Sequence, residues 1–415
     1  MRAWRFRSPA IGEAEVALCP AWTGAEIRAA VGALLRHFEH RLPVDRAARV
    51  VIKPNLNNDL VALTGNSVDL RVLDALLTEL RARGYTDLTV ADGSNVGVER
   101  RGINTLERLR VRPLCDRHGV RTVDLNHDAG RMVVLHGGAH PQVAVTVLDA
   151  DFLISLPKVK THVEAGLSCA MKNWVGITRG QDKRHMHRDL GRNIFALNEV
   201  VTPDLVLVDG LVGMEGNGPG DGSPYRLGQL LMSDHAIVND VVVCQLIGLS
   251  PRAMPYLGHA EEAGRLDQAL LDAVTAEVPR LRAVRPAPAR GALARMADHR
   301  ALEWLKIAAR PITERPEVTA LAYRLGVIQD VYSRQDDSLT ALHRDDRRCS
   351  DCVKCVDFCP TSLPLAEIGH TVDPSRCITC LYCWWVCPKD ALRLEGELGP
   401  LARQAERYKV EIEQL

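Results

Sequence analysis

Eight cysteines near the C-terminal end carry the clearest chemical signal in this sequence. They stand in two runs, CSDCVKCVDFCP from Cys349 and CITCLYCWWVCP from Cys377, and each run has the spacing CxxCxxCxxxCP. In this spacing, three thiolates of one run and the fourth thiolate of the other run bind each of two [4Fe-4S] clusters. Pro360 and Pro388 suit the pattern, because the chain must turn away after each last ligand.

The crossed arrangement of a bacterial-type ferredoxin predicts two ligand sets. They are Cys349, Cys352, Cys355 and Cys387 for one cluster, and Cys377, Cys380, Cys383 and Cys359 for the other. Zinc ribbons also use CxxC pairs, but they need neither the third closely spaced cysteine nor the following proline. A segment of about fifty residues cannot fold on core burial alone, so we expect the clusters to serve as its core.

Lysines give the second signal, because this chain otherwise prefers arginine. Residues 1–300 hold only five lysines, which are Lys53, Lys158, Lys160, Lys172 and Lys183. The last four fall within a short stretch. A compact ammonium binds phosphate or carboxylate as a point charge, and a buried lysine can also lose its proton. The alternative is that these are ordinary surface lysines.

Two predicted strands end on these lysines, ARVVIKPNL and DFLISLPKVKTH. The carboxyl ends of parallel strands share one edge of a sheet, where open α/β folds bind ligands. We therefore predict a catalytic site for a small anion at this edge, with Asn55 beside it. Its predicted residues are Lys53, Lys158, Lys160, His162, Lys172 and Asn173.

Other candidates have two interpretations each. The glycine-rich stretch 213–222 is either a flexible lid or cradle for a ligand or a plain surface loop, and it lacks the GxGxxG pattern of a dinucleotide site. Cys169 is either a reactive thiol or a small buried hydrophobe, and the second is the commoner case. His185 and His187 either bind a metal or are solvated. Flavin remains open, although nothing in the sequence indicates it.

Strands and helices alternate along the first half, which predicts an α/β fold with a mostly parallel sheet and covering helices. We expect a helix over 99–118 disturbed by Pro113, and a hairpin on the sheet around HGGAHPQ. The predicted domains are an α/β domain at 1–280, a linker and helical connector at 281–344, a ferredoxin-like α+β domain at 345–398 and a C-terminal helix at 399–415. An apolar stripe on that helix, from Leu401 to Leu415, predicts packing on its own chain.

Composition excludes several classes of protein. The 415 residues contain 52 basic and 52 acidic side chains, so no overall charge favours nucleic acid or a membrane surface. No apolar run approaches the length of a membrane span, and no secretory signal is recognisable. The remaining cysteines, Cys19, Cys115, Cys169 and Cys244, have no framework spacing, so we expect a reducing cytoplasm.

The motifs KPNL, DGS, PKVKTH, MKNWVG, MEGNGPGDGSP and SDHAIVNDVVVCQLIGL occur in this order. With them, residues of about 45–265 and 345–395 resemble the bacterial and archaeal family catalogued as domain of unknown function 362, whose members often carry a ferredoxin module. One departure is His235, where relatives tend to have proline. The resemblance implies an α/β iron-sulfur protein and brings no settled reaction.

Three hypotheses follow. The leading one is an iron-sulfur oxidoreductase, in which an external electron donor supplies the clusters and a small anionic substrate receives the electrons at the lysine-rich site. The second is an acid-base enzyme, an isomerase or lyase, whose clusters are structural or sense oxygen. The third is an electron carrier whose α/β half is a docking module. Buried lysines with perturbed pKa values would favour the first two.

Overall fold

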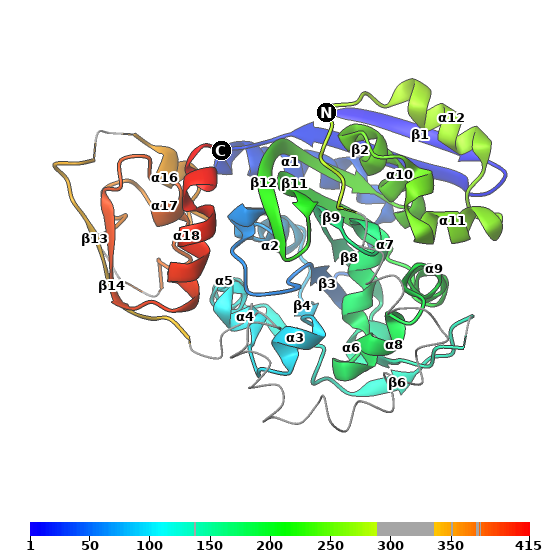
Figure 1. The fold of residues 1–415 in the computed structure, drawn as a ribbon, viewed down its shortest axis with the longest axis horizontal. Helices are drawn as coiled ribbons and strands as arrows, with labels where there is room; N and C mark the ends of the chain where they lie inside the picture. The colour runs from blue at the N-terminus through cyan, green and yellow to red at the C-terminus, as the bar shows by residue number, and fades with distance from the viewer. Residues whose placement is uncertain (137, 289–335, 350–351, 371–372, 374) are drawn as a thin grey trace.

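The computed structural model describes residues 1–136, 138–288, 336–349, 352–370, 373 and 375–415. A large α/β domain and a smaller C-terminal module pack side by side (Figure 1). The predicted connector helices fall within 289–335 and so lie outside the described residues. No helix among the described residues is long and apolar enough to cross a membrane.

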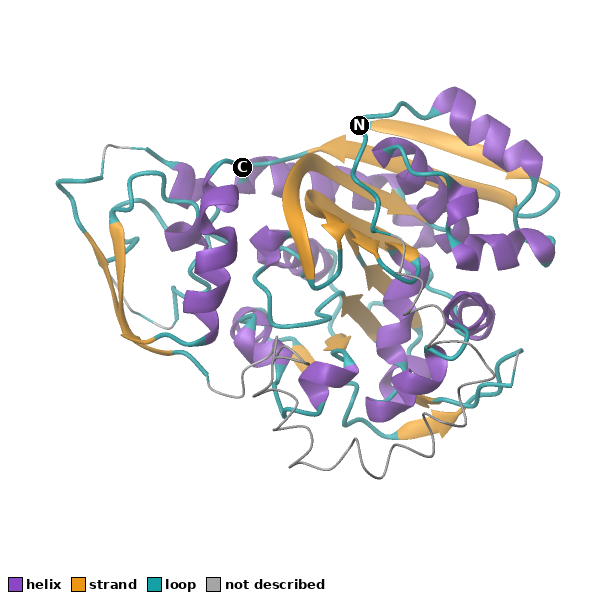
Figure 2. Cartoon of the chain, in the orientation of Figure 1, coloured by secondary structure: helices purple, strands orange, loops and turns teal. Residues whose placement is uncertain are grey.

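The central sheet is parallel through its middle and antiparallel at one side (Figure 2). Its spatial order is β1 (Arg2–Ser8), β2 (Gly12–Pro20), β12 (Asp221–Ser233), β11 (Leu205–Asn217), β8 (Phe152–Leu156), β3 (Val50–Pro54), β4 (Leu88–Asp92) and β5 (Arg121–Asp124). The strands from β11 to β5 are parallel neighbours. After β8 the chain continues into β9 (Lys158–His162), which pairs parallel with β11 and antiparallel with β10 (Gly166–Ser168). The expected mostly parallel α/β sheet is confirmed.

Helices cover both faces of the sheet, and local sequence fixes where they begin. Thr23 and Glu26 form a capping box at α1 (Gly24–His37), and the Asp69 carboxylate caps α2 (Leu70–Ala82). One face packs against α1, α2 and α5 (Val111–Arg117). The other packs against α7 (Ala170–Asn173), α9 (Leu190–Val200), α10 (Ala236–Ile247), α11 (Pro255–Glu262) and α12 (Gln268–Glu277). Short elements complete the domain: α6 (Val145–Leu148), α8 (Lys183–Met186), η1 (Glu39–Arg41), η2 (Ala62–Thr64), η3 (Trp174–Ile177), η4 (Gly180–Asp182) and η5 (Pro251–Ala253).

Two local predictions are wrong. The helix expected over 99–118 is three short helices, α3 (Val96–Glu99), α4 (Thr105–Arg108) and α5, because Asn95 and Asn104 cap new helix starts. Pro113 lies in the first turn of α5, where its missing N–H costs nothing. The hairpin of β6 (Gly130–Met132) and β7 (Gln142–Ala144) forms its own two-stranded sheet instead of joining the main one.

The C-terminal module begins earlier than its predicted start at 345. Strand β13 (Ser338–Arg344) pairs with β14 (Leu392–Glu397), and α16 (Lys354–Asp357) and α17 (Tyr382–Trp385) lie between them in sequence. Helix α18 (Pro400–Glu413) follows, with Leu401, Tyr408 and Ile412 buried in the core that contains α1 and α2. The apolar stripe therefore packs on its own chain, as expected.

Candidate functional site

Two cavities in the C-terminal module are each lined by four cysteines. Cys359, Cys377, Cys380 and Cys383 line the first, which we call the inner cluster site because Cys380 also borders the α/β domain. Cys349, Cys352, Cys355 and Cys387 line the second, the outer cluster site. The fold thus brings each triplet together with the fourth cysteine of the other run.

These thiols suit a cluster better than a single ion. Among the described residues, no three His, Cys, Asp or Glu side chains converge closely enough to hold one metal ion, whereas each set of four thiols lines a cavity. Burial, together with the neighbouring thiols of Cys349 and Cys387, raises the pKa of Cys355 to about 11. Burial also raises the pKa of Cys380 well above the ordinary value for a thiol. Iron that binds four thiolates would offset this cost.

A third cavity opens at the carboxyl edge of the parallel strands, and we call it the lysine pocket. Its lining includes Lys53, Asn55, Asp92, Lys160, His162, Lys172, Asn173 and Lys183. They come from β3, β4, β9, α7, α8 and the loop after β3. Five of the six side chains predicted for the anion site therefore line one pocket, and Lys158 does not.

Lys53 lies at the floor of the pocket in a fully paired arrangement. Its Nζ is 2.5 Å from Asp92 Oδ1 and donates to Asn173 Oδ1 at 2.9 Å. Asn173 Nδ2 donates in turn to Lys53 O and to Ser155 Oγ, which fixes the orientation of the amide. A side chain at Gly176 would come within 2.7 Å of Lys53 Nζ and Asp92 Oδ1, so only glycine fits against this pair.

Lys160 is buried, and no carboxylate of the described residues bonds to it. Its Nζ donates to Asn55 Oδ1 at 2.8 Å and to Asn66 O at 2.7 Å, both neutral acceptors. Burial lowers the pKa of Lys160 well below the ordinary value, and the charge of Lys172 lowers it further. Neutral acceptors do not compensate the loss of water around an ammonium, so this side chain favours its neutral form or an added anion.

Lys172 and Lys183 both line the pocket. Burial lowers the pKa of each to about 8. Lys183 Nζ donates to Thr178 O at 2.6 Å and to Asn126 Oδ1. Within the described part of the chain, Lys172 Nζ has neither a hydrogen bond nor an ion pair, although Glu164 raises its pKa electrostatically. Glu164 itself pairs with His187 at 2.7 Å.

Lys158 occupies a different position from the one predicted. It is fully buried beneath the pocket, with its Nζ 2.7 Å from Asp209 Oδ2 on β11. The same carboxylate oxygen accepts a hydrogen bond from Asp69 N at 2.7 Å. Lys158 therefore supports the structure from below and does not face the pocket.

Sequence reasoning left Lys183 and Gly176 out of the site, and it gave Asp92 no definite role. Lys183 belongs to the same set of five rare lysines, so that count contained the signal. All five lie in the pocket or directly beneath it.

The structure also shows the positions of the other residues that the sequence singled out. Cys169 is 1% exposed and burial raises its pKa well above the usual range, which makes it a buried hydrophobe. The stretch 213–222 forms the tip of the β11–β12 hairpin, and its Pro219 lines the lysine pocket. His187 pairs with Glu164, and no single-ion metal site includes either His185 or His187 among the described residues. His235 accepts a hydrogen bond from Val238 N and caps α10, which accounts for its place there.

Residues 66–70 touch both the lysine pocket and the C-terminal module. Asn66 O accepts from Lys160, and Val68 N donates to Asn55 O, so this segment is bonded directly to two residues that line the pocket. At its other end, Leu70 N donates to Tyr382 Oη at 3.2 Å. Tyr382 lies between two inner-site cysteines in sequence.

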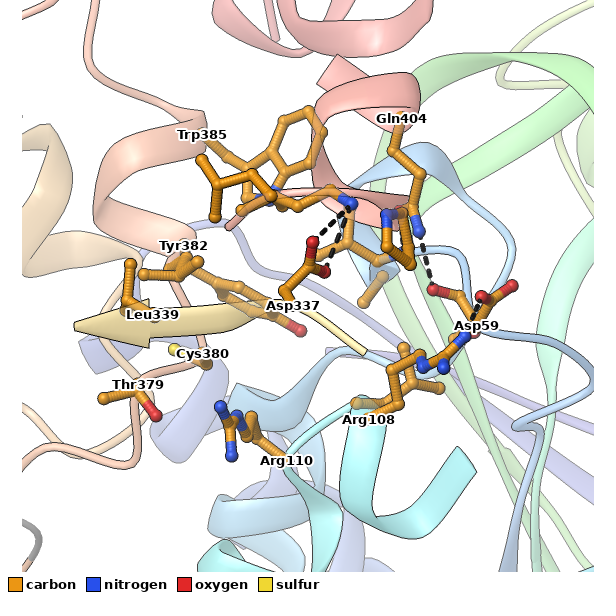
Figure 3. Close-up of a pocket in the computed structure, with 18 of the residues that line it drawn as sticks. Asp59, Arg108, Arg110, Asp337, Leu339, Thr379, Cys380, Tyr382, Trp385 and Gln404 are labelled. Atoms are coloured by element: carbon orange, nitrogen blue, oxygen red, sulfur yellow. Dashed lines mark hydrogen bonds and ion pairs between the residues drawn. The ribbon is translucent and has the colours of Figure 1, made fainter. Parts of the chain in front are cut away.

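Arg71 holds the same junction together. Its guanidinium makes a buried pair with Asp69 at 2.8 Å, donates to Asp357 O at 3.2 Å and lies over the Phe358 ring. Between the two parts lies an interface cavity, lined by Ser67 and Val68 on one side and by Cys380, Tyr382 and Trp385 on the other (Figure 3).

Comparisons with known proteins agree with this division. Residues 50–245 match the family described as domain of unknown function (DUF362), and residues 341–395 match the 4Fe-4S dicluster domain. A thylakoid-associated protein of Synechocystis sp. is 27% identical over 233 residues, which are 52% of this chain and 68% of that protein.

Two solved structures are similar at 14% identity. The lactate racemase apoprotein from Thermoanaerobacterium thermosaccharolyticum has a TM-score of 0.35, with 56% of each chain covered. A Thermotoga maritima protein has a TM-score of 0.29, with 49% of this chain and 53% of that chain covered. This chain thus spans little more than half the length of either.

Proposed function

Because residues 50–245 belong to the domain of unknown function 362 family and residues 341–395 form a 4Fe-4S dicluster domain, we propose that this protein is an iron-sulfur oxidoreductase. In this proposal, electrons from an external donor pass through two [4Fe-4S] clusters to a small anionic substrate in the lysine pocket. The free thiols suit a reducing cytoplasm as its location.

One observation supports the proposal: residues 66–70 bond to the lysine pocket at one end and to the module at the other. Lys160 in the pocket bonds to Asn66 O, and Tyr382 of the module bonds to Leu70 N. Four residues of extended chain span at most about 14 Å. This short link keeps the module close to the pocket, as an electron donor to a bound substrate would have to be.

The side chains of the pocket have separable roles. Bound clusters supply single electrons to the site. Lys160 and Lys172 bind the anion, since both are held in an environment that disfavours a lone ammonium. Lys172 donates the proton that accompanies reduction, because a pKa of about 8 leaves it protonated at neutral pH and able to release the proton easily. Asn173 and Asp92 hold Lys53 in place.

The lowered lysine pKa values also favour a second function, acid-base catalysis as an isomerase or lyase. Lys172 and Lys183, with pKa values of about 8, could exchange protons with a substrate without any electron transfer. The same values argue against a pure electron carrier, which has no need of a buried lysine pocket.

The test begins with anaerobic protein whose clusters have been reduced with dithionite and then freed of excess reductant. A panel of small carboxylates, phosphates and oxyanions is added, and the visible absorbance of the clusters is followed. We expect at least one anion to reoxidise the clusters, and Lys172→Met to block this while the cluster spectrum stays intact.

Arg2→Met is the matched control, because Arg2 is an exposed cation on the edge strand β1 and lines neither the lysine pocket nor a cluster site. It should leave reoxidation unchanged. Conversion of an anion that continues undiminished after the iron is removed, in a protein whose α/β domain is still folded, would establish the acid-base function instead.

A further inference from the structure

Arg110 adopts a backbone conformation that its residue type disfavours. It has φ of 61° and ψ of 25° at the start of α5, in the left-handed region where a non-glycine residue costs about 1–2 kcal/mol. Such outliers persist where the surrounding structure enforces them, and they concentrate at functional sites. Glycine would be the ordinary residue here.

The side chain that this backbone carries has an uncompensated charge. In the described ranges of the chain, the Arg110 guanidinium has neither an ion pair nor a hydrogen bond. Its neighbour in the same cavity differs, because Arg108 pairs with Asp59 at 2.8 Å and with Asp336 at 2.5 Å. The strained residue is thus also the arginine that brings a free positive charge to the interface.

That charge faces the inner cluster site. In Figure 3 the Arg110 guanidinium points from the α/β domain toward Thr379 and Cys380 of the module. The positive charges of Arg110 and Arg117 both act on Cys377, where they oppose the rise in thiol pKa that burial causes. Arg117 reaches the same loop and donates to Ser375 O.

We propose that Arg110 is a tuning residue of the inner cluster: its charge stabilises the reduced state, so that docking on the α/β domain makes this cluster easier to reduce. Reduction adds one electron from an external one-electron donor and breaks no bond. It makes a cluster with four thiolates more negative by one charge, and net charge is among the factors that set cluster potentials. A nearby cation in a poorly solvated interface favours that extra charge.

The experiment is a redox titration of the intact, anaerobic holoprotein with dithionite, followed by EPR. In Arg110→Gly we expect the reduction equilibrium of the inner cluster to shift about tenfold toward the oxidised form, which is 59 mV for a one-electron couple. The outer cluster should not shift. Its signals are identified with Cys349→Ser, which alters an outer ligand.

Two further variants separate charge from structure. Arg110→Lys keeps the charge and should keep most of the wild-type potential, whereas Arg110→Gln keeps side-chain bulk and should behave like Arg110→Gly. Because glycine accepts the left-handed backbone, Arg110→Gly should unfold at the same temperature as the wild type or higher.

Arg112→Gln is the matched control, since Arg112 lies two residues away and bonds instead to Glu107 and Thr122. It should leave both potentials unchanged. Equal shifts of both clusters in Arg110→Gly, or no shift in either Arg110→Gly or Arg110→Gln at full iron content, would overturn the proposal.

Discussion

Burial shifts pKa values for the same reason in the cluster sites and in the lysine pocket, but in opposite directions. Each buries several groups that would carry like charge around one cavity. In the module, burial and neighbouring thiols raise the cysteine pKa values, as at Cys355 and Cys383. In the pocket, burial and neighbouring ammonium groups lower the lysine pKa values, as at Lys160 and Lys172. Both sites disfavour their charged form until an opposite charge arrives.

The two sites differ in the group that supplies the opposite charge. Iron would supply it to the thiolates. Among the described residues, the core beside the cluster sites contains four buried apolar side chains, so we expect the module to need the iron to fold. The pocket belongs to a domain with a large hydrophobic core of its own. Asp92 already offsets Lys53, which leaves the other lysines available to a substrate anion.

The largest expected effect is a loss of iron from the C-terminal module. Because the fold brings each triplet to the fourth cysteine of the other run, Cys359→Ala and Cys387→Ala should each lose about four of about eight irons per chain. Cys359→Ala should damage the site of Cys377, and Cys387→Ala that of Cys349. Iron analysis and EPR measure this. Stoichiometric zinc without a visible chromophore would refute the cluster assignment.

Removing Lys158 tests whether a buried lysine beneath the pocket is structural. Lys158→Met leaves the Asp209 carboxylate buried without its cation, so we expect a loss of about 3–5 kcal/mol in the free energy of unfolding of the α/β domain. Denaturant unfolding measures it. Adding Asp209→Asn should recover part of the loss. Lys172→Met, which removes an unpaired ammonium, should cost far less; equal losses would contradict the structural role.

The pH dependence of stability tests whether burial lowers the pKa of Lys183 in the pocket. Its pKa is about 8 when folded and near the ordinary 10.5 when unfolded, so the cost of burying its charge is fully present below pH 8. Between these values the unfolded chain binds the extra proton, and stability therefore rises with pH. Between pH 7.5 and 9.5, the free energy of unfolding of Lys183→Met should therefore rise by about 2 kcal/mol less than that of the wild type. Parallel curves for wild type and variant would show that Lys183 titrates normally.

The smallest effect lies at the junction of the two regions. Tyr382→Phe leaves Leu70 N without its acceptor and should cost about 1 kcal/mol, with the iron content unchanged. Tyr225→Phe is the control, because in the described structure the buried Tyr225 hydroxyl has no partner and its loss should cost nothing. Calorimetry measures the stability of both variants. An equal or larger loss of stability in Tyr225→Phe would contradict the role of the Tyr382 hydrogen bond at the junction.

The sequence by itself determined the parts whose geometry is local. Cluster ligands come from two short runs, so their spacing alone indicates the chemistry and even the crossed ligand sets. The rule that parallel strands share a carboxyl edge also brought Lys53 and Lys160 to one pocket, since it needs only the strand direction. Helix starts at Thr23 and Asp69 follow from their own capping side chains.

Only the tertiary structure decided which lysines face the pocket. Lys158 and Lys160 stand two residues apart on β9, but the register of β11 shifts between them and places Asp209 opposite Lys158. Arg110 and Cys380 are far apart in sequence, and only the docking of the module brings them to one cavity. Register and docking depend on packing between distant segments, which no local pattern of residues encodes.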